Sequence, residues 1–159
     1  MSVAQILSSI QAVPLLIVED SNEDFETLQR LLKRTSKTIP IHRCINGEQA
    51  LDYLYRRGPY QEKGDLPQPG LIILDLNLPR TDGRQVLHEI KQDQGLKTIP
   101  VVVFTTSSSP RDIQECYQYG VNSYIVKPID FSRLKQDIQT LVDYWFRVAT
   151  LPPRPQGSL

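Results

Sequence analysis

Five charged or hydroxyl side chains of this sequence stand where short apolar runs end. They are Glu19, Asp20, Asp75, Thr105 and Lys127. Apolar runs of this length, bounded by turn residues, indicate buried strands of a parallel sheet rather than helices. Parallel strands all end at one edge of their sheet, which is where open α/β proteins bind ligands. We therefore expect these side chains to converge at that edge although they are scattered along the chain.

The three carboxylates of this set imply a metal ion. Held close together, Glu19, Asp20 and Asp75 would repel one another and raise one another's pKa unless a cation neutralised them. A site made only of oxygen ligands favours Mg²⁺ or Mn²⁺, and a water-rich octahedral site that needs one or two carboxylates suits Mg²⁺. Mg²⁺ is therefore the expected cofactor.

Asp75 is the best candidate for a nucleophile, because its strand is predicted to be central in the sheet and aspartyl phosphates are a known covalent chemistry of carboxylates. A metal, a lysine and a hydroxyl around one carboxylate match what phosphoryl transfer requires. Lys127 would contact one phosphoryl oxygen and the Thr105 hydroxyl another. The two histidines, His42 and His88, fall within a strand and a helix and are not expected at this edge.

Strands and helices alternate along the whole sequence. The predicted strands are Leu15–Val18, a run around Ile39–Ile45, Leu71–Leu74, Pro100–Phe104 and Ser123–Val126. The predicted helices are Glu23–Arg34, one that follows the Asn46-Gly47 turn, one after Gly83, one that starts at Pro110, and a long last one from about Asp130 toward Arg147. This alternation implies a doubly wound α/β fold with a five-stranded parallel sheet. The flavodoxin-like order 2-1-3-4-5 fits best, because it puts the strand that contains Pro40 at an edge.

Length and composition indicate a single globular domain without a membrane span. The chain has 159 residues, of which 40% are hydrophobic and 23% charged, and its apolar runs are too short to cross a bilayer. Its 18 basic and 18 acidic residues form no long basic run, so direct binding of nucleic acid is not expected. No secretion signal is evident and the two cysteines lack metal-ligand spacing, which favours a cytoplasmic location.

Within the chain we expect three parts. Residues 1–13 form a leader, residues 14–148 the domain, and residues 149–159 a tail whose prolines cannot continue the last helix. The tail is expected to contact a dimer partner or to be disordered. Because no second domain follows in the sequence, the output is expected to pass through surface contacts.

The residues singled out above resemble a known family, the receiver domains of two-component response regulators. The matching elements are Glu19-Asp20, Asp75 within LDLNLP, Gly83, Thr105, Tyr124 and Lys127-Pro128. By this resemblance Asp75 is the phosphoacceptor, and Asp20, Asp75 and the main-chain carbonyl of Asn77 bind Mg²⁺, with Glu19 acting through water. The resemblance implies no enzymatic activity beyond self-phosphorylation and slow autodephosphorylation.

The same resemblance implies a switch. Thr105 and Tyr124 would form the switch pair, and the peptide bond before Pro128 would be cis. Movement of Thr105 toward the phosphate would let Tyr124 turn inward and change the face formed by the fourth helix, the fifth strand and the last helix. One departure from the family is Thr106, where many receivers have a smaller residue beside the phosphate.

Three further segments resemble the single-domain regulators associated with bacterial phytochromes, especially those of cyanobacteria. They are GPYQEKGDLPQPG, FTTSSSPRDI and DYWFRVATLPP. This resemblance implies a phytochrome-type histidine kinase as the donor and a homodimer through the last helix and the tail. Tyr144, Trp145 and Phe146 are consecutive and cannot all face one core, so at least one aromatic ring should be exposed or covered by a partner.

Three other functions compete with this interpretation. A phosphoaspartate hydrolase of the haloacid dehalogenase type would need a second aspartate where this chain has Asn77. A flavin-binding module would need a phosphate-cradling loop where this chain has Glu19 and Asp20, which repel phosphate. A receiver-like interaction module that is never phosphorylated is the third alternative.

Overall fold

The computed structural model describes residues 2, 13–35, 38–62 and 66–153. The strands are β1 (Leu15–Val18), β2 (Ile41–Cys44), β3 (Leu71–Leu74), β4 (Val101–Thr105) and β5 (Ser123–Val126). The helices are α2 (Asn22–Thr35), α3 (Gly47–Tyr55), α4 (Gly83–Gln92), α5 (Pro110–Gln118) and α6 (Phe131–Asp143), with a 3₁₀ turn η1 (Gly58–Tyr60) and a π-helical segment η2 (Tyr144–Val148). The predicted leader lies outside the described residues except for Ser2 and Val13, as does the part of the tail from residue 154 onward.

All five strands are parallel and lie in the order β2-β1-β3-β4-β5, which confirms the predicted doubly wound fold. β2 is an edge strand, as the preceding Pro40 suggested. The register pairs Val18 with Leu74, so Glu19 and Asp75 leave neighbouring strands at the same level. It also pairs Thr105 with Val126, so Lys127, which follows Val126 at the end of the edge strand β5, lies at the same level.

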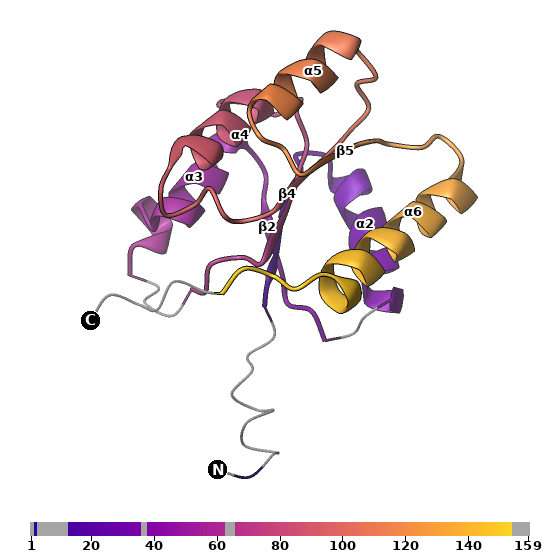
Figure 1. The fold of residues 1–159 in the computed structure, drawn as a ribbon, viewed down its shortest axis with the longest axis horizontal. Coiled ribbons are helices and arrows are strands. Elements are labelled where there is room, and N and C mark those ends of the chain that lie inside the picture. Colours follow the sequence, from indigo (N-terminus) through magenta and orange to yellow (C-terminus); the bar gives the residue numbers. More distant parts are fainter. Residues whose placement is uncertain (1, 3–12, 36–37, 63–65, 154–159) are drawn as a thin grey trace.

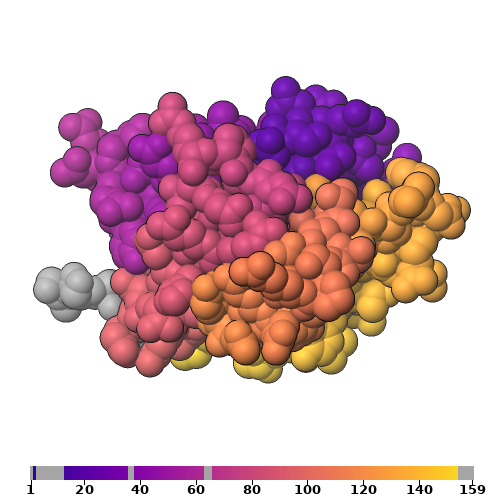
Figure 2. Space-filling view, turned by 90° about the horizontal axis from the view of Figure 1, so that it is seen from above, coloured from indigo at the N-terminus to yellow at the C-terminus, as the bar shows by residue number. Residues whose placement is uncertain are grey.

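Helices cover both faces of the sheet. Figure 1 shows α3, α4 and α5 on one side and α2 and α6 side by side on the other. Side chains along β1 alternate between the layers: Leu16 and Val18 face the first and Leu15 and Ile17 the second, all almost fully buried. Two apolar layers of this kind hold the strand ends rigidly, since close-packed interiors leave little room for displacement. Figure 2 looks down on the edge where the strands end.

Polar caps fix where several helices begin at this edge. Asn46 accepts a hydrogen bond from the Gln49 N–H over 2.8 Å, so α3 starts at Gly47, directly within the predicted turn. The Asp82 carboxylate accepts one from the Arg84 N–H over 2.8 Å at the start of α4. Pro110 opens α5, as predicted, behind a Ser109 cap.

The last helix differs from the prediction of one continuous helix toward Arg147. α6 ends at Asp143 and the π-helical η2 follows, closed by a hydrogen bond from the Ala149 N–H to the Tyr144 carbonyl over 2.6 Å. The change of pitch turns Trp145 and Phe146 toward the core and leaves Tyr144 about half exposed. The expectation that one of these aromatic rings is exposed is confirmed.

The described part of the tail returns to the opposite edge of the sheet. The Leu151 side chain lies so close to Gly70 that a Cβ placed on this glycine would stand 3.0 Å from Leu151 Cδ1. Within the described residues, none of the helices combines the length and the apolar character needed to cross a lipid bilayer.

Candidate functional site

Three carboxylates meet at the edge where β1 and β3 end. Glu19, Asp20 and Asp75 each present one oxygen such that the three oxygens lie within 4.8 Å of one another. Glu19 and Asp75 are buried, at 4% and 7% exposure, and Asp20 is exposed. The sheet register dictates this meeting, because Val18 and Leu74 are paired and the acids directly follow them.

Lys127 reaches across the sheet to the same place. Its Nζ donates to Glu19 Oε1 over 3.0 Å and to Asp75 Oδ2 over 3.3 Å, and the side chain is 12% exposed. The Lys127 N–H donates to the Thr105 carbonyl over 2.7 Å, which extends the pairing of β4 and β5 by one residue and aims the side chain inward. The structure thus brings together four of the five predicted side chains, with Lys127 in direct contact with Glu19 and Asp75 and with Asp20 close by.

Asp24 is a fourth carboxylate that the sequence analysis missed. It lies in the first turn of α2, and its Oδ2 accepts from Lys127 Nζ over 2.9 Å. The sequence signal that could have identified Asp24 is its position four residues after Asp20, in the first turn of a helix that starts beside the strand edge. Three carboxylates therefore contact one ammonium group and Asp20 lies close to two of them, which leaves an excess of negative charge.

The pKa values reflect this crowding. Burial, followed by the hydrogen bond and charge repulsion from Asp75, raises the pKa of Glu19 to about 8 although Lys127 opposes the shift. Burial alone would lower the pKa of Lys127, but its contacts with Asp24, Asp75 and Glu19 outweigh burial and hold it above the ordinary value, so Lys127 stays charged. Burial alone would raise the pKa of Asp24, but the hydrogen bond from Lys127 and its positive charge outweigh burial and lower this pKa.

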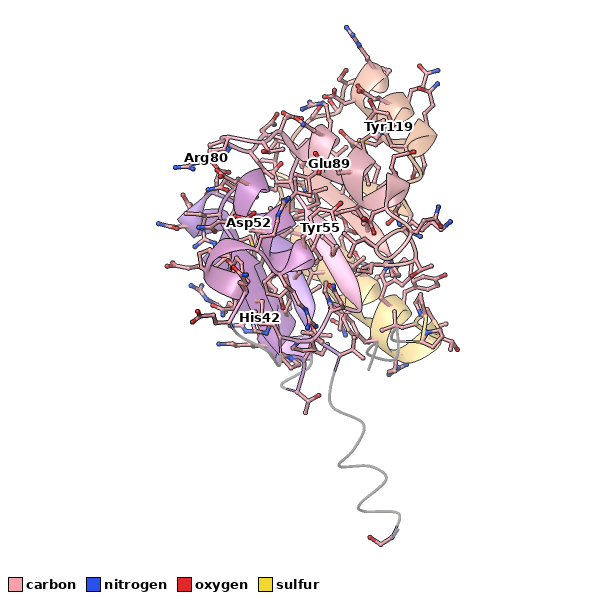
Figure 3. All side chains as sticks on the ribbon, turned by 90° about the vertical axis from the view of Figure 1, so that its left-hand side faces the viewer. His42, Asp52, Tyr55, Arg80, Glu89 and Tyr119 are labelled. Carbon is pink, nitrogen blue, oxygen red and sulfur yellow. The ribbon has the colours of Figure 1, made fainter. Side chains whose placement is uncertain are left out.

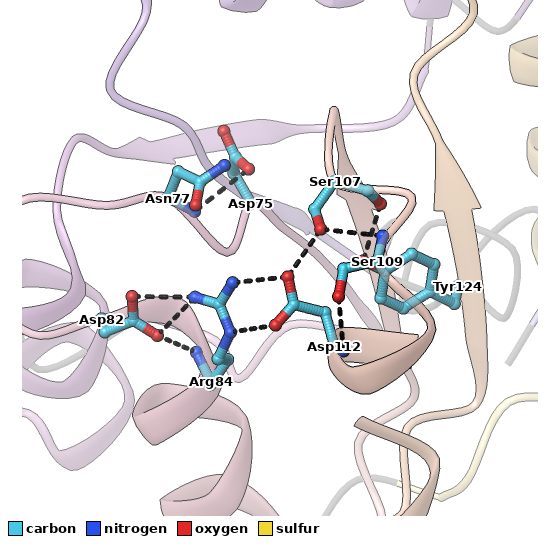
Figure 4. Close-up of polar contacts among 8 residues, drawn as sticks. All are labelled: Asp75, Asn77, Asp82, Arg84, Ser107, Ser109, Asp112 and Tyr124. Carbon is cyan, nitrogen blue, oxygen red and sulfur yellow. Dashed lines mark hydrogen bonds and ion pairs between the residues drawn. The ribbon is translucent and has the colours of Figure 1, made fainter. Parts of the chain in front are cut away.

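A hard divalent cation fits these residues. The available donors are oxygens, they converge within coordination range of a common point, and the surplus negative charge calls for a cation. Glu19, Asp20 and Asp75 are the side chains that could hold it. Asn77 lies beside Asp75, and its N–H donates to Asp75 Oδ1 over 3.3 Å (Figure 4). A contact between the Asn77 carbonyl and the metal stays a prediction.

Gly83 lets the chain turn tightly behind Asp75. Its N–H donates to the Leu76 carbonyl over 2.9 Å, and a Cβ at this position would overlap the Asp75 carbonyl oxygen and lie 2.6 Å from Leu76 Cα. A glycine is required here for close approach rather than for an unusual backbone angle, since its φ is not positive.

The two predicted switch residues lie on neighbouring strands. Thr105 is fully buried at the end of β4, and its Oγ1 has no hydrogen-bond partner in the described structure. Tyr124 in β5 is half-buried, and its hydroxyl donates to the Ser107 carbonyl over 2.8 Å. A buried hydroxyl without a partner is costly, so Thr105 is well suited to bind an incoming acceptor oxygen.

The prediction of a cis bond before Pro128 is wrong. The peptide bond between Lys127 and Pro128 is trans. Trans is intrinsically favoured before proline by about 0.5–1 kcal/mol, and here the trans chain already places Lys127 on its acidic partners.

The two histidines are not at the site, as expected. His42 lies in β2, near the opposite edge of the sheet in Figure 3, with its ring 5.7 Å from that of Tyr53. His88 lies in α4 with its ring 4.4 Å from that of Tyr119. In the same figure Arg80, which follows β3, lies far from His42, toward the top of the view.

Three more residues near the site escaped the sequence analysis. Arg43 in β2 donates from Nε to the Glu19 carbonyl over 3.1 Å, with its guanidinium 4.5 Å from the centre of the Phe25 ring. Arg84 in α4 and Asp112 in α5 form an ion pair beside the Asp75 loop. Each reads in the sequence as an ordinary surface charge.

Comparison with known proteins gives a consistent result. Residues 15–139 match the response regulator receiver domain. The response regulator Rcp1 of Synechocystis sp. is 40% identical over 138 residues, which cover 87% of this chain and 92% of Rcp1. The probable methanogenesis regulatory protein FilR2 of Methanothrix harundinacea is 40% identical over 131 residues, which cover 82% of each chain.

Solved structures of two such regulators are similar to this chain. The phosphorylated cyanobacterial phytochrome response regulator RcpA superposes with a TM-score of 0.83 at 39% identity, over 89% of this chain and 99% of RcpA. The Mn²⁺-bound form of Rcp1 has a TM-score of 0.83 at 39% identity, over 89% of this chain and 99% of Rcp1. The family match over residues 15–139 contains every strand end described above.

Proposed function

Because the chain belongs to the response regulator receiver family, we propose that it accepts a phosphoryl group on Asp75 from a histidine kinase, with Mg²⁺ bound beside it. The observation that carries the proposal is the group of three carboxylate oxygens within 4.8 Å, with Lys127 in contact with Asp75. The Mn²⁺-bound form of Rcp1 supports a divalent cation in a protein of this kind.

In this reaction an Asp75 oxygen attacks the phosphorus of a phosphohistidine. The new O–P bond forms as the P–N bond breaks, and the electron pair of that bond stays on the imidazole. Lys127 then pairs with one phosphoryl oxygen, and the unpartnered Thr105 hydroxyl donates to another. Bound Mg²⁺ would offset the charge of the carboxylates and of the phosphoryl oxygens.

Phosphorylation would be read out on the face made by α5, β5 and α6. Thr105 is drawn to the phosphoryl oxygens and Tyr124 settles in its inward position, which changes this face. A groove of about 1010 Å³ runs along it between β5 and α6, and Tyr124, Ile125 and Trp145 are among the residues that line it. A surface of this size is suited to a protein partner.

The donor we propose is a phytochrome-type histidine kinase. The similarity to RcpA, a cyanobacterial phytochrome response regulator, supports this choice, whereas FilR2, which is 40% identical, is a probable methanogenesis regulatory protein. Three exposed apolar side chains, Val126, Ile129 and Phe131, flank the site where β5 leads into α6. In Figure 2 this segment lies beside α2. Residues of α2 and Ile129 line a depression of about 280 Å³ between them. A helical kinase surface could dock there.

We further propose a homodimer through the last helix. Tyr144 and Val148 at its end are 52% and 69% exposed, which a partner would cover. The described tail residues fold against the sheet edge instead, so α6 and η2 carry the contact and the tail supports them. Analytical ultracentrifugation of the chain with and without phosphorylation tests this, and a concentration-independent monomer in both states would contradict it.

The decisive experiment is intact-mass analysis after incubation with acetyl phosphate and Mg²⁺. The natural chain should gain one phosphoryl group, Asp75→Asn should gain none, and omission of Mg²⁺ should suppress the gain. Asp137→Asn, which changes an aspartate on α6, is the matched control and should be phosphorylated normally. No gain by the folded natural chain would favour the alternative, a receiver-like interaction module that is never phosphorylated.

Other features stay predictions. Self-phosphorylation and slow autodephosphorylation are the only reactions we assign to the chain, in line with receiver domains as signalling modules. The domain limits of 14–148, a cytoplasmic location and the absence of direct nucleic-acid contact are expectations from the sequence.

A further inference from the structure

Arg84 links the loop after Asp75 to the start of α5. Its Nε donates to Asp112 Oδ1 over 2.9 Å and its Nη2 donates to Asp112 Oδ2 over 2.8 Å, so the guanidinium grips both oxygens. Its Nη1 also donates to Asp82, the residue that caps α4, over 3.0 and 3.1 Å (Figure 4). The arginine therefore joins the amino ends of two helices.

Asp112 passes this link on to the switch tyrosine. Its Oδ2 accepts a hydrogen bond from Ser107 Oγ over 2.6 Å, and the carbonyl of the same serine accepts one from the Tyr124 hydroxyl over 2.8 Å. We call the chain Arg84, Asp112, Ser107 and Tyr124 the polar bridge. It runs from the loop that carries Asp75 to the face formed by α5, β5 and α6 without passing through Thr105.

The bridge is more than an incidental surface ion pair. Arg84 and Asp112 are 24% and 17% exposed, and a two-pronged contact between arginine and a carboxylate fixes direction as well as charge. The contacts of Asp112 with Arg84 and Ser107 lower its pKa to about 2, so it is ionised at neutral pH. A cation in the first turn of a helix also opposes the helix dipole, so the position of Arg84 needs the two carboxylates to offset it.

We infer that Arg84 and Asp112 are positioning residues for the switch: they hold Ser107 where its carbonyl accepts the hydrogen bond from the Tyr124 hydroxyl, the orientation that we call inward. The inference rests on the proposed role of Tyr124. Without the pair, Ser107 loses its hydrogen-bond acceptor and the loop between β4 and α5 is free to shift, so Tyr124 would populate the outward orientation more often. A ligand that binds only the inward state would then bind more weakly, by the factor by which the population of that state falls.

The first test follows Tyr124 in the unphosphorylated protein by ¹⁹F NMR of fluorotyrosine-labelled chains, with Tyr124→Phe used to assign the signal. Asp112→Asn and Arg84→Met should shift the Tyr124 signal toward the outward state, with a change of about tenfold in the population ratio, or about 1.4 kcal/mol. Arg84→Lys keeps the positive charge but cannot contact both Asp112 oxygens as the guanidinium does, so it should give a smaller change in the population ratio. Glu48→Gln removes an exposed ion pair with Arg80 and is the matched control.

The second test titrates beryllium fluoride, a stand-in for the phosphoryl group, in the presence of Mg²⁺. Affinity should fall in Asp112→Asn by the same factor as the population of inward Tyr124. An unchanged Tyr124 signal in the folded variants overturns the inference, and so does a shifted signal with unchanged beryllium fluoride affinity. If a variant does not fold, Arg84→Lys alone decides by the same two measurements.

The two proposals fail in distinguishable ways. Absence of beryllium fluoride binding by the natural chain, together with no mass gain on Asp75, would reject the phosphoryl-acceptor function. The Tyr124 signal of the free protein tests the position of the tyrosine whatever that outcome is.

Discussion

The Arg43 side chain holds the main chain of Glu19, from whose carbonyl its Nε lies 3.1 Å away. Its Nη2 reaches the Asp20 carbonyl over 3.4 Å, and the guanidinium lies above the Phe25 ring. One arginine on the edge strand thus fixes the backbone of two acids that we expect to bind metal, while its charge partly offsets theirs.

Replacing Arg43 with Gln should weaken Mg²⁺ binding by about tenfold, the low end of the effect of outer partners on metal sites. The reason is that the Glu19-Asp20 backbone loses its tether. Isothermal titration calorimetry with Mg²⁺ measures the change. Lys33→Gln, which removes a positive charge at an exposed position of α2, is the control. Equal Mg²⁺ affinities in the two variants would mean that Arg43 acts only through its charge and not by holding the backbone.

The Arg84–Asp112 contact should make stability depend on pH. Because the pKa of Asp112 is lowered to about 2 from the ordinary 3.8, its contribution is complete above about pH 4 and is lost as the pH falls toward 2. Asp112→Asn should therefore be less stable than the natural chain by about 1–2 kcal/mol at pH 6, allowing for partial exposure. Urea unfolding at pH 6, 4 and 3 should show the difference narrowing. A constant difference would mean that the carboxylate charge is not its source.

Gly83→Ala should destabilise the chain by about 1–3 kcal/mol, the usual cost of overpacking. The added methyl would overlap the Asp75 carbonyl, so the loop that carries Asp75 must move. Denaturant unfolding gives the loss, and acetyl phosphate uptake should fall with it. Gly95→Ala, where the nearest atom to the new methyl is the Asp93 carboxylate oxygen at 3.3 Å, should change stability little. Because Gly→Ala on its own reduces the entropy of the unfolded chain, an equal loss of stability in both variants would mean that overlap with the Asp75 carbonyl is not the source.

Thr106→Ala should shorten the lifetime of the phosphorylated form severalfold. Thr106 is exposed next to the site and borders the depression that Lys127 also lines, so its side chain limits the approach of water to the phosphoryl group. Intact mass followed over time after removal of the donor measures the lifetime. Ser108→Ala, two residues further on, is the control. Equal lifetimes in Thr106→Ala and the natural chain would show that the Thr106 side chain does not shield the phosphoryl group.

The fold and the acidic site could be predicted from the sequence because both follow from where apolar runs end. Leu15–Val18 and Leu71–Leu74 are short, fully apolar and bounded by turns. When these strands pair in parallel, Glu19 and Asp75 follow paired residues and must lie close together. The edge position of β2 has a local reason, since the preceding Pro40 cannot donate to a strand ladder.

The polar bridge could not be predicted in this way. Arg84 and Asp112 stand 28 positions apart on different helices, and no periodicity in the sequence fixes how two helix ends approach each other. The trans bond before Pro128 and the change of pitch after Asp143 were missed for a similar reason, because both depend on packing that local patterns leave undetermined.

The site also has an order of assembly. Lys127 contacts Glu19 across 108 positions of the chain and directly follows β5, which is made after the other four strands of the sheet. A nascent chain that has finished only β3 holds its acids at the sheet edge without their lysine, and pairings this distant in sequence form late in folding. On the proposed function, the site would therefore become able to accept a phosphoryl group only after β5 has been synthesised.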